Sequence, residues 1–434
     1  MAGRRLSSNE VSVVIALAIV VLVLLLVYVA ERGEGPREPV GAVEGGGSRA
    51  VGRDPVDRPA ATTPDADAPH AAMPEGCGIE SARPGQSEAE AQAVVERQRE
   101  EALQAILPAL EARPEARARA AGLYFRAARG LIDRSTGDAC QAQPDACPTL
   151  EQRRLDDSDS AEALARLAVN SSDPQVYAWA YRSCARVSRE AAGTCQLVNA
   201  LQWARLDPAN AAPWFAVAQE AKSRKDSAGV DDAMFHVAAA TIHDPGWGRA
   251  AAEMIDAAPP ANEQIVGTWL AALDALGYES LDLPSLQESS TFCQARALAN
   301  ANRRDLCDRI AAVLVDRSTT LLARSVGVGL AKRLDWPAEK LAATELERDA
   351  ANALAGREAP RSSDSVTCAN VRSDLALFVD NARLGEVEAL RQRIAALGES
   401  VDTLAAEHRR IAAADREAHA ARAAASAASG VSGG

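Results

Sequence analysis

The side chains best suited to chemistry in this chain are its eight cysteines, all of which follow an apolar segment near the start. Thiols can bind metals, catalyse redox reactions or form disulfides, and spacing separates these uses. None of the cysteines has the C-x2-C spacing of a zinc site or a thioredoxin-like redox site. An even number in one compartment is consistent with a disulfide framework.

We predict four disulfides from the placement of the cysteines. Two pairs lie symmetrically about a turn between two helical patterns, and such positions face each other across an αα-hairpin. A third pair shares one Pro-containing loop, and the fourth joins the remaining two cysteines. The alternative is eight free, mostly buried thiols. The predicted pairs are Cys184–Cys195, Cys293–Cys307, Cys140–Cys147 and Cys77–Cys368.

One further constellation involves histidine. Asp232 and His236 are four residues apart in a helical pattern, so they could share a face, and His243 is two turns beyond. Such groups could hold a transition metal, but exposed or singly buried side chains are the simpler interpretation. The sequence has no GxSxG, HExxH or Walker A motif, and Gly327-Val328-Gly329 lies in an apolar helical pattern. We therefore predict no catalytic residue, metal or cofactor.

An N-terminal membrane anchor is the clearest element that would position these groups. Residues 11–30 are uncharged and long enough to span a bilayer once as a helix. A cleaved signal peptide is the alternative, but its apolar core would be shorter. The basic residues that flank the segment nearly balance, so charge does not set the orientation.

The cysteines decide the orientation instead, because disulfides persist outside the reducing cytoplasm. Only four of the 47 basic residues are lysine, and a composition dominated by Ala and Arg is typical of a GC-rich bacterium. We therefore expect a single-pass protein of the inner (cytoplasmic) membrane with a periplasmic soluble domain.

Composition predicts an all-α soluble domain. Aromatic residues make up only 4% of the chain, while hydrophobic residues reach 47% and lean on Ala, which favours helices. No stretch alternates with the period of a strand. The net charge of −13 argues against a nucleic-acid partner.

Changes in composition divide the chain into seven parts. A short cytoplasmic tail precedes the anchor, a Gly/Pro-rich linker follows it, and helical patterns then continue almost to the end. Ser87 and Glu90 form the capping-box pattern of a helix start. The expected boundaries are 1–10 (tail), 11–30 (anchor), 31–86 (linker), 87–160 (helical pair with the Cys140/Cys147 loop), 161–356 (helical repeats), 357–424 (C-terminal hairpin or coiled coil) and 425–434 (disordered tail).

Within the repeat region, helices are expected over 262–277, 291–300, 303–315, 318–334 and up to about 355. Asp-Pro dipeptides recur at residues 173, 207 and 244, which are 34 and 37 residues apart. Trp179, Trp214 and Trp247 recur at spacings of 35 and 33. A period near 34 is that of tetratricopeptide repeats.

The best unit, residues 211–245, resembles a degenerate tetratricopeptide repeat. Trp214 matches the signature Trp, and the other signature places are taken by Val217, Ala218, Ala221, Ala233, Val237 and Pro245. The resemblance covers roughly 70 residues and implies a helical solenoid whose concave face binds peptides or proteins. The alternative is an irregular α-α array with coincidental Asp-Pro turns.

The C-terminal region has a heptad-like apolar stripe, interrupted at Gly398 and Ser400. It is consistent with a helical hairpin over 371–382 and 386–397 that packs on the domain, or with a short two-stranded coiled coil. In the second case a homodimer would form through Val387, Leu390, Ile394, Leu397, Val401 and Leu404.

These features favour a membrane-tethered helical-repeat module that binds a protein or peptide in the cell envelope, with a scaffolding or assembly role and no enzymatic activity. Two alternatives remain open. One is an enzyme on a helical scaffold with an unrecognised active site, which a deep pocket with converging acids would favour. The other is a structural spacer without a ligand, which would show neither pocket nor groove.

Overall fold

The computed structural model describes residues 87–136, 158–186, 193–260, 264–283, 286–358 and 367–430. Every regular element within these ranges is a helix, which confirms the all-α fold class. Two isolated parallel bridges, Asn210–Ile242 and His243–Ser318, also occur there. The predicted anchor, the linker and the Cys140/Cys147 loop lie outside the described residues. No helix in the described ranges combines the length and apolarity needed to cross a bilayer.

The first helices start where local signals predict. The Ser87 hydroxyl accepts from the Glu90 N–H, and the Glu90 carboxylate accepts from the Ser87 N–H at 2.8 Å, so the capping box is formed. The helices up to residue 206 are α2 (Glu88–Ala112), α3 (Ala116–Thr136), α6 (Ser158–Ala168), α7 (Pro174–Arg186), the 3-10 helix η2 (Thr194–Leu197) and α8 (Ala200–Leu206).

The middle of the chain continues as short helices. The first two form a hairpin over the predicted repeat unit, with a turn at which Lys225 adopts a left-handed backbone (φ 60°). The elements are α9 (Ala211–Ser223), α10 (Ser227–Ala239), α11 (Arg249–Ala257), α12 (Ile265–Leu281), α13 (Gln287–Phe292), the 3-10 helix η4 (Ala295–Ala299), α14 (Ala301–Arg317) and α15 (Leu321–Arg333).

The single helix expected over residues 291–300 is wrong. The chain leaves the helical conformation at Gln294 (φ −67°, ψ 153°) and continues as η4. A disulfide joins Cys293, just after α13, to Cys307 inside α14. This cross-link holds the end of α13 against α14, and the backbone must turn there rather than continue straight.

Four helices complete the chain: α16 (Ala338–Glu358), α17 (Cys368–Leu384), α18 (Glu386–Ala396) and α19 (Val401–Gly430). The predicted hairpin corresponds to α17 and α18, and the predicted interruption lies at Gly398, where φ is +67°. The expected disorder from residue 425 onward does not match α19, which continues to Gly430. Its Ala-rich sequence explains the difference, because Ala has the highest helix propensity.

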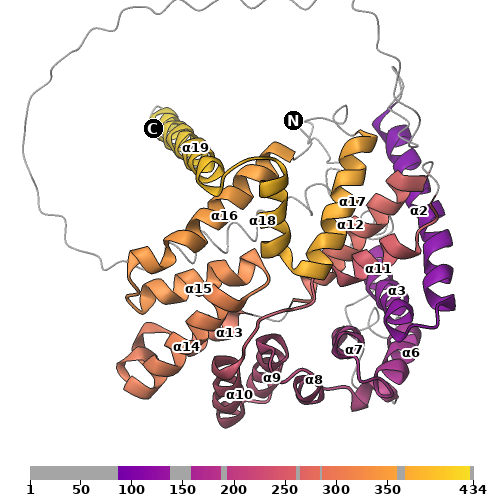
Figure 1. The fold of residues 1–434 in the computed structure, drawn as a ribbon, viewed down its shortest axis with the longest axis horizontal. Helices are drawn as coiled ribbons and strands as arrows, with labels where there is room; N and C mark the ends of the chain where they lie inside the picture. The colour runs from indigo at the N-terminus through magenta and orange to yellow at the C-terminus, as the bar shows by residue number, and fades with distance from the viewer. Residues whose placement is uncertain are drawn as a thin grey trace, which may run out of the picture.

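The chain folds back on itself around three hydrophobic cores. In the first core, Tyr124 and Trp179 stack with ring centroids 6.0 Å apart. Helices α2, α3, α6 and α7 surround this core together with α11, α12 and the late helix α17, which lies beside α11 and α12 (Figure 1). The second core joins α9 and α10 to α14 and α15, and the third joins α16 to α18 and α19.

The coiled-coil stripe packs mainly inside the chain. Val387, Ile394 and Leu404 are buried, and Leu390 and Val401 pack against the third core. Of the six predicted dimer residues, Leu397 is the one that stays largely exposed, at 46%.

Gly327 illustrates how closely the small residues let these helices approach. A Cβ atom at this position would lie 2.8 Å from the Cβ of Leu314 and from the backbone nitrogen of Val315 on α14. Gly327 therefore serves the packing of α15 on α14, and the Gly-Val-Gly segment lies inside a helix.

Candidate functional site

Asp232, His236 and His243, the three side chains considered as possible metal ligands, lie in different environments. His236 stacks on Trp214 with ring centroids 3.9 Å apart, and Asp232 is exposed. His243 is buried, and its Nδ1 lies 2.9 Å from the Ser318 hydroxyl. Burial lowers the pKa of His243 to about 4, so the ring is neutral at physiological pH. Within the described ranges, no three His, Cys, Asp or Glu side chains lie together as a metal site.

The described cysteines are all oxidised. The structure contains the disulfides Cys184–Cys195 and Cys293–Cys307, both among the pairs that the sequence predicts. Cys368 is also disulfide-bonded. Its predicted partner Cys77 lies outside the described residues, as do Cys140 and Cys147.

An open groove of about 800 Å³ in the described residues is the candidate binding site. One side is the α9–α10 turn, residues 222–231. The other side is residues 288–306, which run from α13 through η4 into α14. We call it the polar groove, because charged and amide side chains form most of its lining. Its volume is in the usual range for ligand sites, roughly 300–1,000 Å³.

The two sides of the polar groove are tied together by ion pairs. Lys222 Nζ lies 2.8 Å from Glu288 Oε1, and Arg303 Nη2 lies 3.0 Å from Asp231 Oδ1. The Arg303 guanidinium also lies 3.7 Å from the centre of the Phe292 ring, a cation–π contact. These contacts fix the α9–α10 hairpin relative to α13 and α14, so the groove exists before any ligand binds.

The Cys293–Cys307 disulfide supports this groove from beneath. Both cysteines are fully buried. They follow directly after Phe292 and Leu306, which line the groove. The disulfide therefore positions the α13 end and the first turns of α14, which carry part of the lining.

Sequence reasoning identified the disulfide but missed the groove. The one signal available was the concentration of lysine, because Lys222 and Lys225 are two of the four lysines in the chain. The other lining cations are arginines, which are common throughout the sequence. Nothing local distinguishes Arg296 or Arg303 from the rest.

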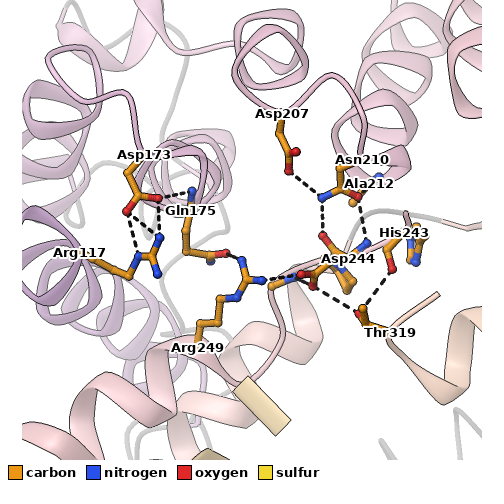
Figure 2. A network of polar contacts seen from close by, with 12 residues as sticks. Arg117, Asp173, Gln175, Asp207, Asn210, Ala212, His243, Asp244, Arg249 and Thr319 are labelled. Carbon is orange, nitrogen blue, oxygen red and sulfur yellow. Dashed lines mark hydrogen bonds and ion pairs between the residues drawn. The ribbon is translucent and has the colours of Figure 1, made fainter. Parts of the chain in front are cut away.

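The three Asp-Pro turns meet in one polar network, shown in Figure 2. Asp173 caps α7 and pairs with Arg117 at 2.9 Å. Asn210 donates to Asp207 at 2.8 Å and to the Asp244 carbonyl at 2.7 Å, which links the second and third turns. The residues of the Asp-Pro turns therefore link neighbouring helices through hydrogen bonds and ion pairs.

Arg249 joins the first turn to the third. It donates to the Gln175 side chain at 2.7 Å and pairs with Asp244. A second cleft of about 530 Å³ includes Arg117 and Arg249. Both of these arginines are held in ion pairs of the network, with Asp173 and with Asp244.

Several helix N-termini receive a carboxylate from a different helix, in the absence of a side-chain cap of their own at η2 and α11 and in addition to one at α8 and α15. The clearest case is α11, whose N-cap is Gly248 and has no side chain. Burial raises the pKa of both Glu279 and Glu386 to about 7, against the effect of the N–H donors. The N–H groups and their acceptors are Thr194 and Cys195 to Glu162, Ala200 to Glu220, Gly248 and Ala250 to Glu279, and Leu321 to Glu386.

These contacts explain how an Ala-rich chain holds a defined shape. An N-terminal N–H that lacks a partner is costly when buried, and a carboxylate also interacts favourably with the positive end of the helix dipole. Each such contact fixes one helix relative to another.

No protein family, curated protein or solved structure matches this chain.

Proposed function

We propose that this chain is a membrane-tethered module of the cell envelope that binds a peptide or protein segment in the polar groove. The observation that carries the proposal is the groove itself, an open site of about 800 Å³ with charged residues on both sides. Its shape suits an extended segment better than a small enclosed substrate. The role would be capture or assembly of a partner.

The sequence supplies the rest of the proposal. Residues 11–30 have the length and apolarity of a membrane anchor, and residues 31–86 would let the helical domain reach away from the bilayer. The disulfides are typical of an oxidising compartment, so we propose a periplasmic domain. The hairpin of α9 and α10, which forms one side of the groove, is the unit that resembles a tetratricopeptide repeat.

Site-specific crosslinking in cells tests the groove. A photoreactive residue at Asn302, which lines the groove, is expected to form an adduct with a partner protein. The same residue at Asp402, an exposed position on α19, serves as the matched control. Ser227→Trp, which fills the groove from the α10 side, should abolish the Asn302 adduct. Equal adducts at both positions, or an adduct that persists in Ser227→Trp, would contradict the proposal.

Thiol labelling tests the proposed compartment. Cells are quenched with acid, denatured and treated with a maleimide polymer that adds mass to each free thiol. We expect no labelling of the full chain until a reductant is added, because the described cysteines are paired. Labelling without reductant would mean that the domain resides in a reducing compartment, and the partner would then be cytosolic.

A further inference from the structure

The polar groove is cationic although the chain is acidic. The net charge of the whole chain is −13. The groove is lined by four cations, Lys222, Lys225, Arg296 and Arg303, and by three acids, Asp226, Asp231 and Glu288. This local excess of cations is opposite in sign to the net charge of the whole chain.

The three acids of the groove are already engaged. Glu288 pairs with Lys222 and Asp231 pairs with Arg303. Asp226 is the N-cap of α10, and its side chain accepts from the Gly229 N–H at 2.9 Å. None of these carboxylates is available to neutralise the two remaining cations.

Lys225 and Arg296 are those two cations. Neither pairs with an acid of the described residues, and Arg296 lies beside the Gln294 amide. Lys225 stands in the α9–α10 turn, where its backbone is left-handed. Arg296 stands on η4, on the other side of the groove. An occupant of the groove would therefore meet a cation on each side.

The N-termini of two helices add to the positive charge of the groove. Both α10 and α14 begin at the groove, which is lined by Ser227 of the first turn of α10 and by Asn302 of the first turn of α14. The N-terminus of a helix carries a partial positive charge. These two ends add to the side-chain charges of Lys225 and Arg296 and do not replace them as the basis of recognition.

We infer that the polar groove recognises an acidic peptide segment of a partner protein, with carboxylates placed on Lys225 and Arg296; this inference rests on the proposed function. A nucleic-acid strand suits the groove less well, because it carries a phosphate on every nucleotide and would set several of them against the three carboxylates of the walls. A peptide can place single carboxylates where the cations are and amides against Asn300 and Asn302.

Fluorescence anisotropy with the full chain in detergent tests the recognition. The probes are a fluorescein-labelled octapeptide of alternating Asp and Gly and its counterpart of alternating Asn and Gly. We expect the Asp peptide to bind at least about tenfold more tightly, and to weaken as NaCl rises from about 50 to about 500 mM, because salt screens exposed charges. The double variant K225E/R296E should abolish the preference.

The matched control is R410E/R416E, which changes the net charge equally at two exposed positions of α19. It should keep the preference for the Asp peptide. Equal binding of the Asp and Asn peptides would overturn the inference, and so would equal effects of the two double variants. Tighter binding of a fluorescein-labelled oligothymidylate than of the Asp peptide would overturn it in favour of nucleic acid.

Crosslinking separates this inference from the proposed function on which it rests. If the adduct at Asn302 forms in cells and persists in K225E/R296E, the groove binds a partner but not through these cations, and the inference is wrong. If no groove-specific adduct forms in the native chain, the proposed function itself fails. Loss of the adduct in K225E/R296E alone, with an acidic segment identified in the crosslinked peptide, supports both.

Discussion

Replacing Glu279 with Leu lowers the free energy of unfolding by about 3–5 kcal/mol, because it leaves buried polar groups without their partner. The Glu279 side chain is fully buried and accepts from the N–H groups of Gly248 at 2.8 Å, Ala250 at 3.1 Å and the Trp179 indole at 3.2 Å. It also offsets the charge of buried Arg182. Urea denaturation followed by circular dichroism measures the loss.

The matched control is Glu101→Leu on α2, where the carboxylate is exposed. That substitution should change the free energy of unfolding by less than about 0.5 kcal/mol, as is usual for surface positions. If both variants lose the same stability, the carboxylate does not serve as the cap of α11.

Glu279→Gln extends the test to pH. Burial raises the pKa of folded Glu279 from 4.5 to about 7, although the Ala250 N–H and Arg182 lower it. As pH rises through this window, the unfolded chain loses a proton that the folded chain keeps. The contribution is therefore full below pH 4.5 and is lost by about pH 7, an effect of about 3 kcal/mol. Glu279→Gln should remove this contribution to the pH dependence of the free energy of unfolding, and the contribution of Glu386 should remain.

The double variant C293A/C307A is expected to lose both stability and groove binding. The disulfide closes a loop with a sequence separation of 14 residues, for which the chain-entropy estimate is about 3 kcal/mol. It also holds α13, and with it Glu288 and Phe292, against α14. Without it, the wall that faces the α9–α10 turn should move, and the Asp peptide should lose its preference for the groove.

C184A/C195A is the matched control, because that disulfide has a similar separation of 11 residues and lies outside the groove. It should lose comparable stability in urea and still bind the Asp peptide. If the peptide binds equally well to both double variants, the Cys293–Cys307 disulfide does not position the groove.

The parts of the fold that sequence predicted well are those set by neighbouring residues. The capping box at Ser87 and Glu90 and the break at Gly398 depend on side chains within a few positions, and both are present. The helix expected over 291–300 failed because its course is set by a cross-link to Cys307 in another helix. Propensity alone cannot register such a constraint.

The candidate site escaped prediction for the same reason. Its two sides are contributed by residues 222–231 and 288–306, which no local pattern connects. The histidine pattern, for which the simpler interpretation is exposed or singly buried side chains, brings no three potential metal ligands together in the described residues. His243 is buried, and its partner there is Ser318, 75 residues away in the sequence, which no local pattern connects to it.

The carboxylates that bind the N-terminus of a different helix also limit how this helical array can evolve. A simple solenoid grows by duplicating one repeat, because each unit contacts only its neighbours. Here the first N–H of α15, beside the cap that Thr320 supplies, donates to Glu386, 65 residues further along the chain. The N-terminus of α11 depends on Glu279, 31 residues beyond Gly248. A duplicated α11 or α15 would arrive without its carboxylate. Inheritance of this architecture therefore favours substitution within a fixed number of helices over the gain or loss of whole units.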